Sequence, residues 1–364
     1  MHITQLETPA VVVDLDILAD NINRLSQYAK QHNLKVRPHT KTHKIPAIAR
    51  MQIESGCHGI TVAKSGEAAV MAAGGLDNIL VAYPVFGTEK ADRLAALARE
   101  KKITVAVDSP VTVNALSEAA RKAGSTIHLL VEIDVGMRRC GVGSPAAVLA
   151  LAQHIAKQPN VHFAGITFYP GQIWNPPPGQ TEPLHHVADL VAATLQQLSS
   201  EGFSCEIVSG GSTPTAFNSH LVPLLTEIRP GTYVFNDRNT VGVGACSLDQ
   251  CALRVMVTVV STAVPGRAIV DGGSKTFSSD RWLSGAKEGF GHVVEDPGTL
   301  FVSTSEEHGH LDISASARKF EIGDTVSIIP NHVCACVNMH DRIWYHRNGA
   351  VEGYWSVEGR GKVI

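Results

Sequence analysis

Residues 102–134, KITVAVDSPVTVNALSEAARKAGSTIHLLVEID, contain the structural unit that recurs along this chain. Two apolar, β-rich runs, KITVAVD and IHLLVEID, lie on either side of a stretch with helical patterning. Nearly continuous apolar strands that alternate with helices are typical of a parallel sheet covered by helices. The stretch therefore predicts an α/β fold.

The alternation extends in both directions from this unit and includes eight apolar runs in total. They are LKVRPH, GITVA, NILVAYPV, KITVAVD, IHLLVEID, VHFAGITFY, CEIVSGG and TEIRPGTYVF, which begin near residues 34, 59, 78, 102, 127, 161, 205 and 226. Eight units within about 225 residues fit a closed (β/α)8 barrel of the TIM type, for which about 250 residues are typical. A doubly wound open sheet is the structural alternative.

The window from residue 14 to residue 31 has the spacing of an amphipathic helix, and Asp14 is available as its N-cap. The apolar positions, at steps of four, three and four, are Leu18, Ile22, Leu25 and Ala29. The window HHVADLVAATLQQLSSEG has the same character and ends at Gly202, a residue type that often terminates helices. Both windows predict helices.

The pattern changes near residue 250. The runs ALRVMVTVVST, GRAIVDGG, TLFVSTS, DTVSIIP, DRIWYHRNG and AVEGYWSV are strand-like and are separated by turn residues. We therefore predict a barrel domain at residues 10–248 and an antiparallel β domain at residues 249–364.

Composition excludes several classes of partner. The chain has 364 residues, a formal net charge of −3 and 18% charged residues. A nucleic-acid or membrane-surface ligand would require a basic patch that this sequence lacks, so we expect a small-molecule ligand. No apolar run approaches the roughly 18 residues that cross a bilayer, and the N-terminus does not resemble a leader, so we expect a cytoplasmic protein. The seven scattered cysteines do not suit a disulfide framework.

Polar residues follow several of the apolar runs, at the point where a barrel builds its active site. These segments are PHTK, EIDVGMRRCGV, FYPGQIW, SGGSTPT and YVFND, after the first, fifth, sixth, seventh and eighth runs. SGGSTPT has glycines and hydroxyls that suit a phosphate, although it also suits a polar turn that caps a helix. Lys41, in PHTK, is either a solvated surface lysine or a lysine that forms a Schiff base with a carbonyl. A Schiff-base lysine together with a phosphate cradle is what pyridoxal phosphate (PLP) requires.

The segment PNHVCACVNMHD, residues 330–341, is a candidate metal site. If the segment is extended, His332 and Cys334 share one face, and an imidazole with a thiolate suits zinc. Cys336 has the same alternation and is a possible third ligand. A buried histidine beside a free thiol is the alternative. His308, in STSEEHGHLDIS, is a candidate for a contact near the metal, for a dimer contact or for a simple hairpin turn.

Seven of these motifs, in this order, resemble the D-threonine aldolase and D-serine dehydratase family. They are RPHTKTHK, EIDVGMRRCGV, SGGSTPT, EIRPGTYVFND, VDGGSK, EEHG and PNHVCACVN. The resemblance implies the alanine-racemase type of PLP fold, fold type III, in which a barrel precedes a β domain that residues 1–9 join. It also implies a homodimer.

The resemblance implies a role for particular residues. Lys41 carries the cofactor, and Arg139 contacts its pyridine ring. The phosphate contacts are Gly210, Gly211, Ser212, Thr213 and Tyr233. The metal ligands are His332 and Cys334. Tyr169 is a further expected cofactor contact. Some aldolases carry a histidine, proposed as the base, after the corresponding tyrosine, whereas Pro170 stands here, so His39 and Tyr169 are the candidate bases.

The resemblance implies a PLP-dependent lyase, assisted by zinc or manganese, that acts on β-hydroxy-D-amino acids. Retro-aldol cleavage to glycine and an aldehyde is the first hypothesis. Dehydration of D-serine or 3-hydroxyaspartate to a 2-oxo acid and ammonia is the alternative, which the His-x-Cys pair favours because familiar aldolases carry His-x-Asp. A non-catalytic PLP-binding protein, an amino-acid racemase and a PLP-free metal-dependent hydrolase are more distant alternatives.

Overall fold

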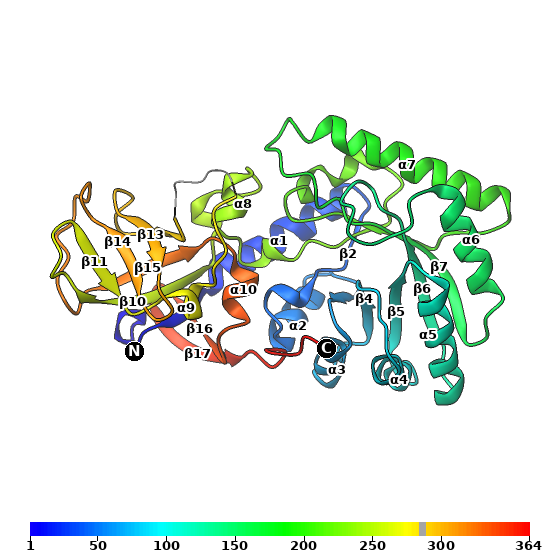
Figure 1. Cartoon of the computed structure of the whole chain (residues 1–364), viewed down its shortest axis with the longest axis horizontal. Helices are drawn as coiled ribbons and strands as arrows, with labels where there is room; N and C mark the ends of the chain where they lie inside the picture. The colour runs from blue at the N-terminus through cyan, green and yellow to red at the C-terminus, as the bar shows by residue number, and fades with distance from the viewer. Residues whose placement is uncertain (284–288) are drawn as a thin grey trace. The chain divides into compact units, whose positions relative to one another are not determined.

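The computed structural model describes residues 1–283 and 289–364, which form two compact units (Figure 1). The β unit comprises residues 1–23, 42–44 and 232–360. The barrel unit comprises residues 24–41, 45–231 and 361–364. The chain passes between the units more than once, and one crossing lies between Lys41 and Thr42. The domain boundary proposed between residues 248 and 249 stays a prediction.

The barrel unit contains an eight-stranded parallel sheet with the strand order β2-β9-β8-β7-β6-β5-β4-β3. The strands are β2 (Lys35–Val36), β3 (Ile60–Val62), β4 (Asn78–Val81), β5 (Lys102–Val107), β6 (Ile127–Glu132), β7 (Val161–Thr167), β8 (Ile207–Gly210) and β9 (Glu227–Ile228). Each predicted apolar run contains one of these strands. The predicted TIM-type barrel is therefore confirmed.

Hydrogen bonds beyond β2 join the two end strands of this sheet. His39 forms a parallel bridge with Thr61 of β3, and the Thr61 N–H donates to the Pro38 carbonyl at 2.8 Å. The Thr40 hydroxyl donates to the Thr61 carbonyl at 3.0 Å. The segment that leads to Lys41 is therefore held against β3 on the barrel side.

Helices cover the outer face of the parallel strands, as α4 to α7 show in Figure 1. They are α2 (Pro46–Glu54), α3 (Ser65–Ala73), α4 (Thr88–Leu97), α5 (Pro110–Ala123), α6 (Pro145–Ala156) and α7 (Thr181–Ser200). Short 3-10 segments lie at Thr40–Thr42 (η2) and Ala216–Leu221 (η3). In β5 every residue from 103 to 107 is buried, because helices cover one face and the barrel interior encloses the other.

Helix α1 (Leu15–Gln31) follows β1 (Ala10–Asp14). The Asp14 carboxylate accepts hydrogen bonds from the N–H groups of Asp16 and Ile17 at 3.0 and 3.2 Å. These bonds satisfy donors that have no partner within the helix itself. The predicted cap is therefore confirmed, as is the predicted apolar face, since Leu18 and Leu25 are fully buried.

The β unit contains a nine-stranded sheet with the order β11-β14-β13-β12-β15-β10-β1-β16-β17, and β11 also pairs with β10. Its remaining strands are β10 (Leu253–Ser261), β11 (Arg267–Val270), β12 (Gly291–Val293), β13 (Leu300–Thr304), β14 (Gly309–Asp312), β15 (Thr325–Pro330), β16 (Arg342–Arg347) and β17 (Ala350–Ser356). Its helical segments are η1 (Ile3–Gln5), η4 (Thr232–Val234), α8 (Arg238–Gly242), η5 (Leu248–Gln250), α9 (Ser274–Phe277) and α10 (Val333–Val337). The strands predicted after residue 250 are present.

The N-terminus is part of this sheet. Strand β1 is antiparallel to β10, with Val11 opposite Val255, and parallel to β16. His2 forms a bridge with Ala350, and the Ile3 N–H donates to the Gly349 carbonyl at 2.9 Å. The first residues of the chain thus pack with strands formed by its last third.

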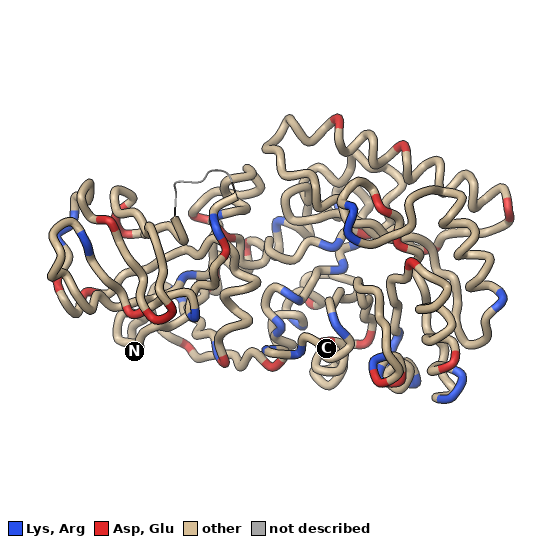
Figure 2. The backbone as a smooth tube through the Cα atoms, viewed as in Figure 1, with Lys and Arg blue, Asp and Glu red and all other residues tan. Residues whose placement is uncertain are grey.

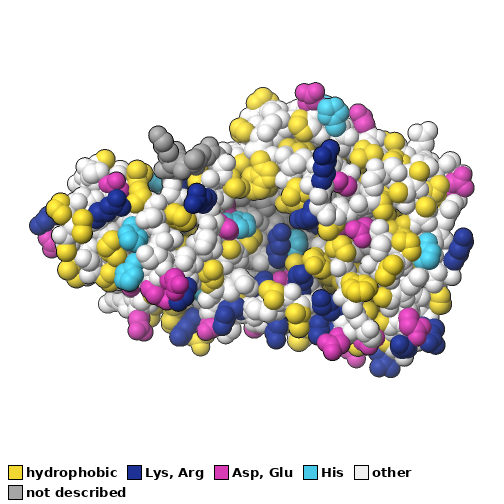
Figure 3. Space-filling view, in the orientation of Figure 1, with side chains coloured by type: hydrophobic (Ala, Val, Ile, Leu, Met, Phe, Trp, Pro, Cys, Tyr) yellow, Lys and Arg dark blue, Asp and Glu magenta, His cyan; other side chains and the backbone are white. Residues whose placement is uncertain are grey.

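Charge is mixed on the surface. Lysine and arginine alternate with aspartate and glutamate along both units (Figure 2), and charged and hydrophobic side chains are interspersed on the face seen in Figure 3. Within residues 1–283 and 289–364, no helix combines the length and the apolar character that a membrane crossing needs.

A buried ion pair connects β2 to β9. The Arg37 guanidinium donates to both carboxylate oxygens of Glu227 at 2.9 and 3.0 Å, and both side chains are 1% exposed. Arg37 also donates to the Asn78 side chain at 2.8 Å, and His58 Nε2 lies 3.0 Å from Glu227. A Cβ atom at Gly59 would lie 2.6 Å from the guanidinium, so this position has no room for a side chain.

The partners of Glu227 keep its carboxyl group ionised. Burial raises its pKa, but the Arg37 charge and the hydrogen bond with His58 outweigh burial and lower the pKa to about 2. A carboxylate with a lowered pKa adds stability above its unfolded pKa and loses it as the pH falls toward the folded value. Its contribution therefore disappears between about pH 5 and about pH 2.

We expect Glu227→Gln to lower the free energy of unfolding by on the order of 3–5 kcal/mol at neutral pH, because it leaves the Arg37 charge buried without its partner. Urea unfolding followed by circular dichroism measures this loss. The difference from the wild type should shrink as the pH falls from about 5 toward 2.

The matched control is Glu118→Gln, which breaks an exposed pair with Arg121 on α5 at 2.8 Å. Solvent screens that pair, so the control should lose much less stability. Equal losses in the two variants would show that burial does not decide the strength of the Arg37–Glu227 pair.

Candidate active site

The carboxyl ends of the barrel strands bring several polar side chains together. Lys41 and His39 follow β2, Glu132 ends β6, and Tyr169 follows β7. Arg139 lies in the loop after β6. The sequence predicted these positions, with the exception of Glu132, from the rule that barrel sites form where strands end.

His39 lies among positive charges. Its Nδ1 accepts a hydrogen bond from the Lys41 backbone N–H at 3.4 Å, so the proton of the neutral ring is on Nε2. Burial lowers the pKa of His39 well below the usual range, and the charges of Lys41, Arg229 and Arg139 lower it further. The ring is therefore neutral at physiological pH and presents an N–H donor.

Arg229, which directly follows β9, is a residue that the sequence interpretation missed. The side chain is buried, and it donates to the Thr167 hydroxyl at 3.1 Å and to the Phe168 carbonyl at 2.7 Å. Its Nε has no hydrogen-bond partner among the described residues. An arginine within the eighth apolar run, in EIRPG, was the available signal. A buried donor without a partner indicates a ligand position.

Glu132 and Arg139 give the site charges of both signs. Burial raises the pKa of Glu132, and the charges of Arg229 and Arg139 oppose that rise. The Arg139 guanidinium lies 4.7 Å from the centre of the Tyr169 ring, within cation–π distance. The three side chains line one small hollow.

The loop that carries Arg139 is ordered by a carboxylate. Asp134 accepts hydrogen bonds from the N–H groups of Gly136 and Arg138 at 2.9 and 3.0 Å. Gly136 has a φ of 121°, a backbone conformation that other residues rarely adopt. The loop therefore returns to the strand ends in one defined shape.

The last residue of β8 and the turn after it contain four of the five predicted phosphate residues. Gly210 passes so close to Phe168 that a Cβ atom would lie 2.4 Å from its ring, and Gly211 has a φ of 86°. The Ser212 hydroxyl lies 3.1 Å from that of Thr215, and the Thr213 hydroxyl accepts from the Gly231 N–H at 3.2 Å. Glycine is thus required twice in this turn. Tyr233, the other predicted phosphate contact, belongs to the β unit, in η4.

The predicted metal pair lies in the β unit, after β15. His332 precedes α10, and Cys334 is inside this short helix. The expectation of an extended segment was therefore wrong: the chain turns into a helix directly after the strand. His332 and Cys334 nevertheless hydrogen-bond each other, and the sulfur of Cys334 lies 3.2 Å from the Thr42 hydroxyl and 3.8 Å from that of Thr232.

A buried carboxylate holds the histidine of this pair. His332 Nδ1 lies 3.0 Å from Asp237 Oδ2. The pKa of His332 is well above its usual range, because the Cys334 charge and the hydrogen bonds with Asp237 and Cys334 outweigh the opposing effect of burial. An ion bound to this ring would therefore displace a proton.

The helix separates Cys336 from this pair. Cys336 is fully buried and its sulfur donates to the Thr276 carbonyl at 3.3 Å. Burial raises the pKa of its thiol to about 12. His308 is in the turn that joins β13 and β14, so the hairpin interpretation is correct as far as its local structure goes. Among the described residues, no group of three or more histidine, cysteine, aspartate and glutamate side chains is arranged to hold a metal ion.

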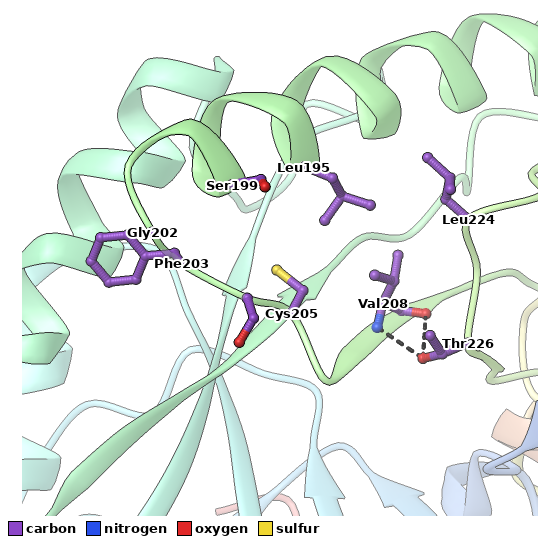
Figure 4. A pocket seen from close by; sticks show the side chains of 9 residues that line it. Leu195, Ser199, Gly202, Phe203, Cys205, Val208, Leu224 and Thr226 are labelled. Carbon is purple, nitrogen blue, oxygen red and sulfur yellow. Dashed lines mark hydrogen bonds between the residues drawn. The ribbon is translucent and has the colours of Figure 1, made fainter.

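The barrel unit also has a pocket of about 490 Å³ near the beginning of β8, where Figure 4 shows the Thr226 hydroxyl bonded to the Val208 backbone. It is lined by Leu195, Ser199, Gly202, Phe203, Ser204, Cys205, Val208, Leu224 and Thr226. Burial raises the pKa of the Cys205 thiol to about 12, and none of the described lining residues is charged. The pocket therefore offers no charged side chain, and its thiol is held in the protonated, weakly nucleophilic form.

Comparison with known proteins identifies the class of this fold. The family described as "Alanine racemase, N-terminal domain" matches residues 13–239, which is more than half of the chain. The family described as "Putative serine dehydratase domain" matches residues 252–346. The first match is the barrel class in which PLP is the expected cofactor.

Full-length relatives narrow the class. A D-threonine aldolase of Arthrobacter sp. is 33% identical over 99% of this chain and 94% of its own length. The crystal structure of D-threonine aldolase from Filomicrobium marinum is 32% identical, covers 99% of this chain and 98% of that one, and has a TM-score of 0.92. D-threo-3-hydroxyaspartate dehydratase from Delftia sp. HT23 is 29% identical, covers 98% of both chains and has a TM-score of 0.90.

The chain therefore belongs to the family of D-threonine aldolases and D-serine dehydratases, within the alanine-racemase fold. The predicted family and fold class are confirmed. The chain is an enzyme of the lyase type, as predicted.

The two cysteines of α10 should differ in reactivity. We expect iodoacetamide to alkylate Cys334, which is half-buried, much faster than Cys336, whose thiol is enclosed and has a pKa of about 12. Peptide mass spectrometry of the native, chelator-treated protein over a time course measures both rates. Comparable rates at the two sites would contradict the arrangement of this helix.

Proposed function

We propose that this protein is a PLP-dependent, divalent-metal-assisted lyase that cleaves β-hydroxy-D-amino acids to glycine and an aldehyde. Similarity to D-threonine aldolases over almost the whole chain carries this proposal. The arrangement of Lys41, His39, Arg139 and Arg229 at the barrel strand ends supports it.

The residues of the barrel unit fit PLP. Lys41 supplies an amine for the cofactor aldehyde, and the unpartnered Nε of Arg229 offers a buried donor to a ligand. Three cationic side chains, Lys41, Arg139 and Arg229, act on His39, a setting that suits an anionic cofactor. When bound, PLP withdraws electrons from the α-carbon of an amino acid.

We propose the following contacts between the barrel residues and bound PLP. Lys41 Nζ would carry the cofactor, with Arg139, Arg229 and Tyr169 around its ring. The turn of Gly210, Gly211, Ser212 and Thr213, with Tyr233, would hold its phosphate, because glycines permit close backbone approach and hydroxyls donate to phosphate oxygens.

The two candidate bases are not equivalent. His39 Nδ1 is engaged by the Lys41 N–H, so its Nε2 carries the proton and donates. The Thr61 backbone also hydrogen-bonds the ring, so we propose that His39 acts as a hydrogen-bond donor that orients its neighbours and not as the base. Tyr169 Oη, in its phenolate form, is then the remaining candidate to accept the proton of the substrate hydroxyl, while the amine of Lys41 is suited to move a proton at the α-carbon.

His332 and Cys334 would hold the divalent ion. Imidazole and thiolate suit zinc, and harder ions such as manganese remain alternatives. Two protein ligands would leave positions for water and for the substrate hydroxyl, and the ion when bound would act there as a Lewis acid.

Dehydration is the second candidate function. The His-x-Cys pair favours it, as does Pro170, which stands where some aldolases have a proposed base. A D-threo-3-hydroxyaspartate dehydratase with one cysteine replaced by alanine has been solved in the metal-free form and has a TM-score of 0.90 to this chain. We retain a homodimer and a cytoplasmic location as predictions.

The spectrum of the purified protein tests Lys41. We expect a visible absorption band that borohydride bleaches, and we expect Lys41→Ala to lack it because the variant has no amine at this position. Lys44→Ala is the matched control from the same motif: its side chain bonds the Asn338 oxygen at 2.8 Å in the β unit, and the variant should keep the band. Retention of the band by Lys41→Ala would show that another lysine carries PLP.

Product analysis tests the reaction. With D-threonine and added zinc or manganese we expect glycine and acetaldehyde in equal amounts, with less 2-oxo acid and ammonia from D-threonine or D-serine. A chelator should abolish turnover, and re-addition of the ion should restore it. A predominance of oxo acid and ammonia would establish the dehydratase, and neither product from any β-hydroxy-D-amino acid would contradict the lyase proposal.

A further inference from the structure

Asp237 is a buried carboxylate at the start of α8 that the reaction proposed above does not use. The side chain is fully buried, and its two oxygens have different partners. Oδ1 accepts from the Thr240 N–H at 2.9 Å and caps α8. Oδ2 accepts from the Val333 N–H at 3.1 Å and lies 3.0 Å from His332 Nδ1.

The contact with His332 determines which ring nitrogen carries a proton. An ionised carboxylate has no donor, so His332 Nδ1 must donate its N–H to Oδ2. In a neutral ring this leaves Nε2 as the nitrogen with a lone pair. A histidine binds a metal ion through an unprotonated nitrogen, and a carboxylate on the opposite nitrogen commonly fixes that tautomer.

Helix capping alone does not explain this arrangement. A cap requires one side-chain oxygen, and Oδ1 fulfils that role. Oδ2 instead contacts two consecutive residues, His332 and Val333, at the start of α10. Asp237 therefore connects the start of α8 to the start of α10. Because the backbone at both helix starts is fixed, the carboxylate also fixes the imidazole of His332.

We infer that Asp237 is a positioning residue for the metal site: it keeps His332 in the tautomer whose Nε2 can bind the ion. The inference rests on the proposed role of His332 and Cys334. Asp237 would act through the histidine and not through contact with the ion.

Asp237→Asn tests the inference with little change of shape. An asparagine has one acceptor, so it can serve either the Thr240 N–H or the pair of Val333 and His332, but not all three. If its NH2 group faces His332, Nδ1 must accept and the proton moves to Nε2. We expect zinc to bind the variant roughly 10–100-fold more weakly, as measured by competition with a chromophoric chelator at one neutral pH.

Thr240→Val is the matched control. Its hydroxyl receives the Asp237 N–H at 2.8 Å and donates to the Asp237 carbonyl at 2.7 Å, so the variant weakens the same cap but keeps the carboxylate on His332. It should bind zinc nearly as the wild type does. An equal loss in Thr240→Val and Asp237→Asn would show that the cap is responsible and would overturn the inference.

His332→Ala separates failure of the inference from failure of the metal site. If His332→Ala loses zinc but Asp237→Asn retains wild-type affinity, the inference is wrong and the proposed site stands. If the wild type binds no zinc, or His332→Ala binds it unchanged, the proposed metal site itself is wrong and the inference falls with it.

Discussion

The ion pair between Arg37 and Glu227 connects two very short strands, and the geometry of the candidate site depends on that connection. Strands β2 and β9 have two residues each, so few backbone hydrogen bonds join them. The buried pair adds a charge-assisted contact, in which Arg37 Nε is shared between both carboxylate oxygens, where the ladder is weakest. His39 and Lys41 follow Arg37 by two and four residues, so the position of β2 determines theirs.

The strand ends then create an electrostatic environment that no single motif contains. Burial is the main reason that the pKa of His39 is lowered and its ring stays neutral, and the nearby charges of Lys41, Arg229 and Arg139 add to that effect. Glu132 moderates this charge while its own pKa is raised by burial. Because three cations act on His39, an anionic ligand would be favoured beside it, and the neutral His39 is suited to donate a hydrogen bond.

In the β unit, one carboxylate serves several needs at once. Asp237 caps α8, accepts an N–H of α10 and contacts His332, so the histidine proposed to bind the metal is held by contacts with both short helices. Thr42, the residue after Lys41, places a hydroxyl beside Cys334 in the same unit. Thr42 thus contacts a residue that lies 292 positions further along the chain.

The sequence by itself determined the barrel, the β domain, the family and the positions of Lys41, His332 and Cys334, because apolar periodicity and short motifs are local properties. It did not reveal the helix at residues 333–337, since alternation of His332, Cys334 and Cys336 is equally compatible with a strand. Arg229, Glu132 and Asp237 emerged only from the tertiary structure. Their roles arise from burial and from partners distant in the chain, such as Thr167 and His332, and such partners are not encoded in local spacing.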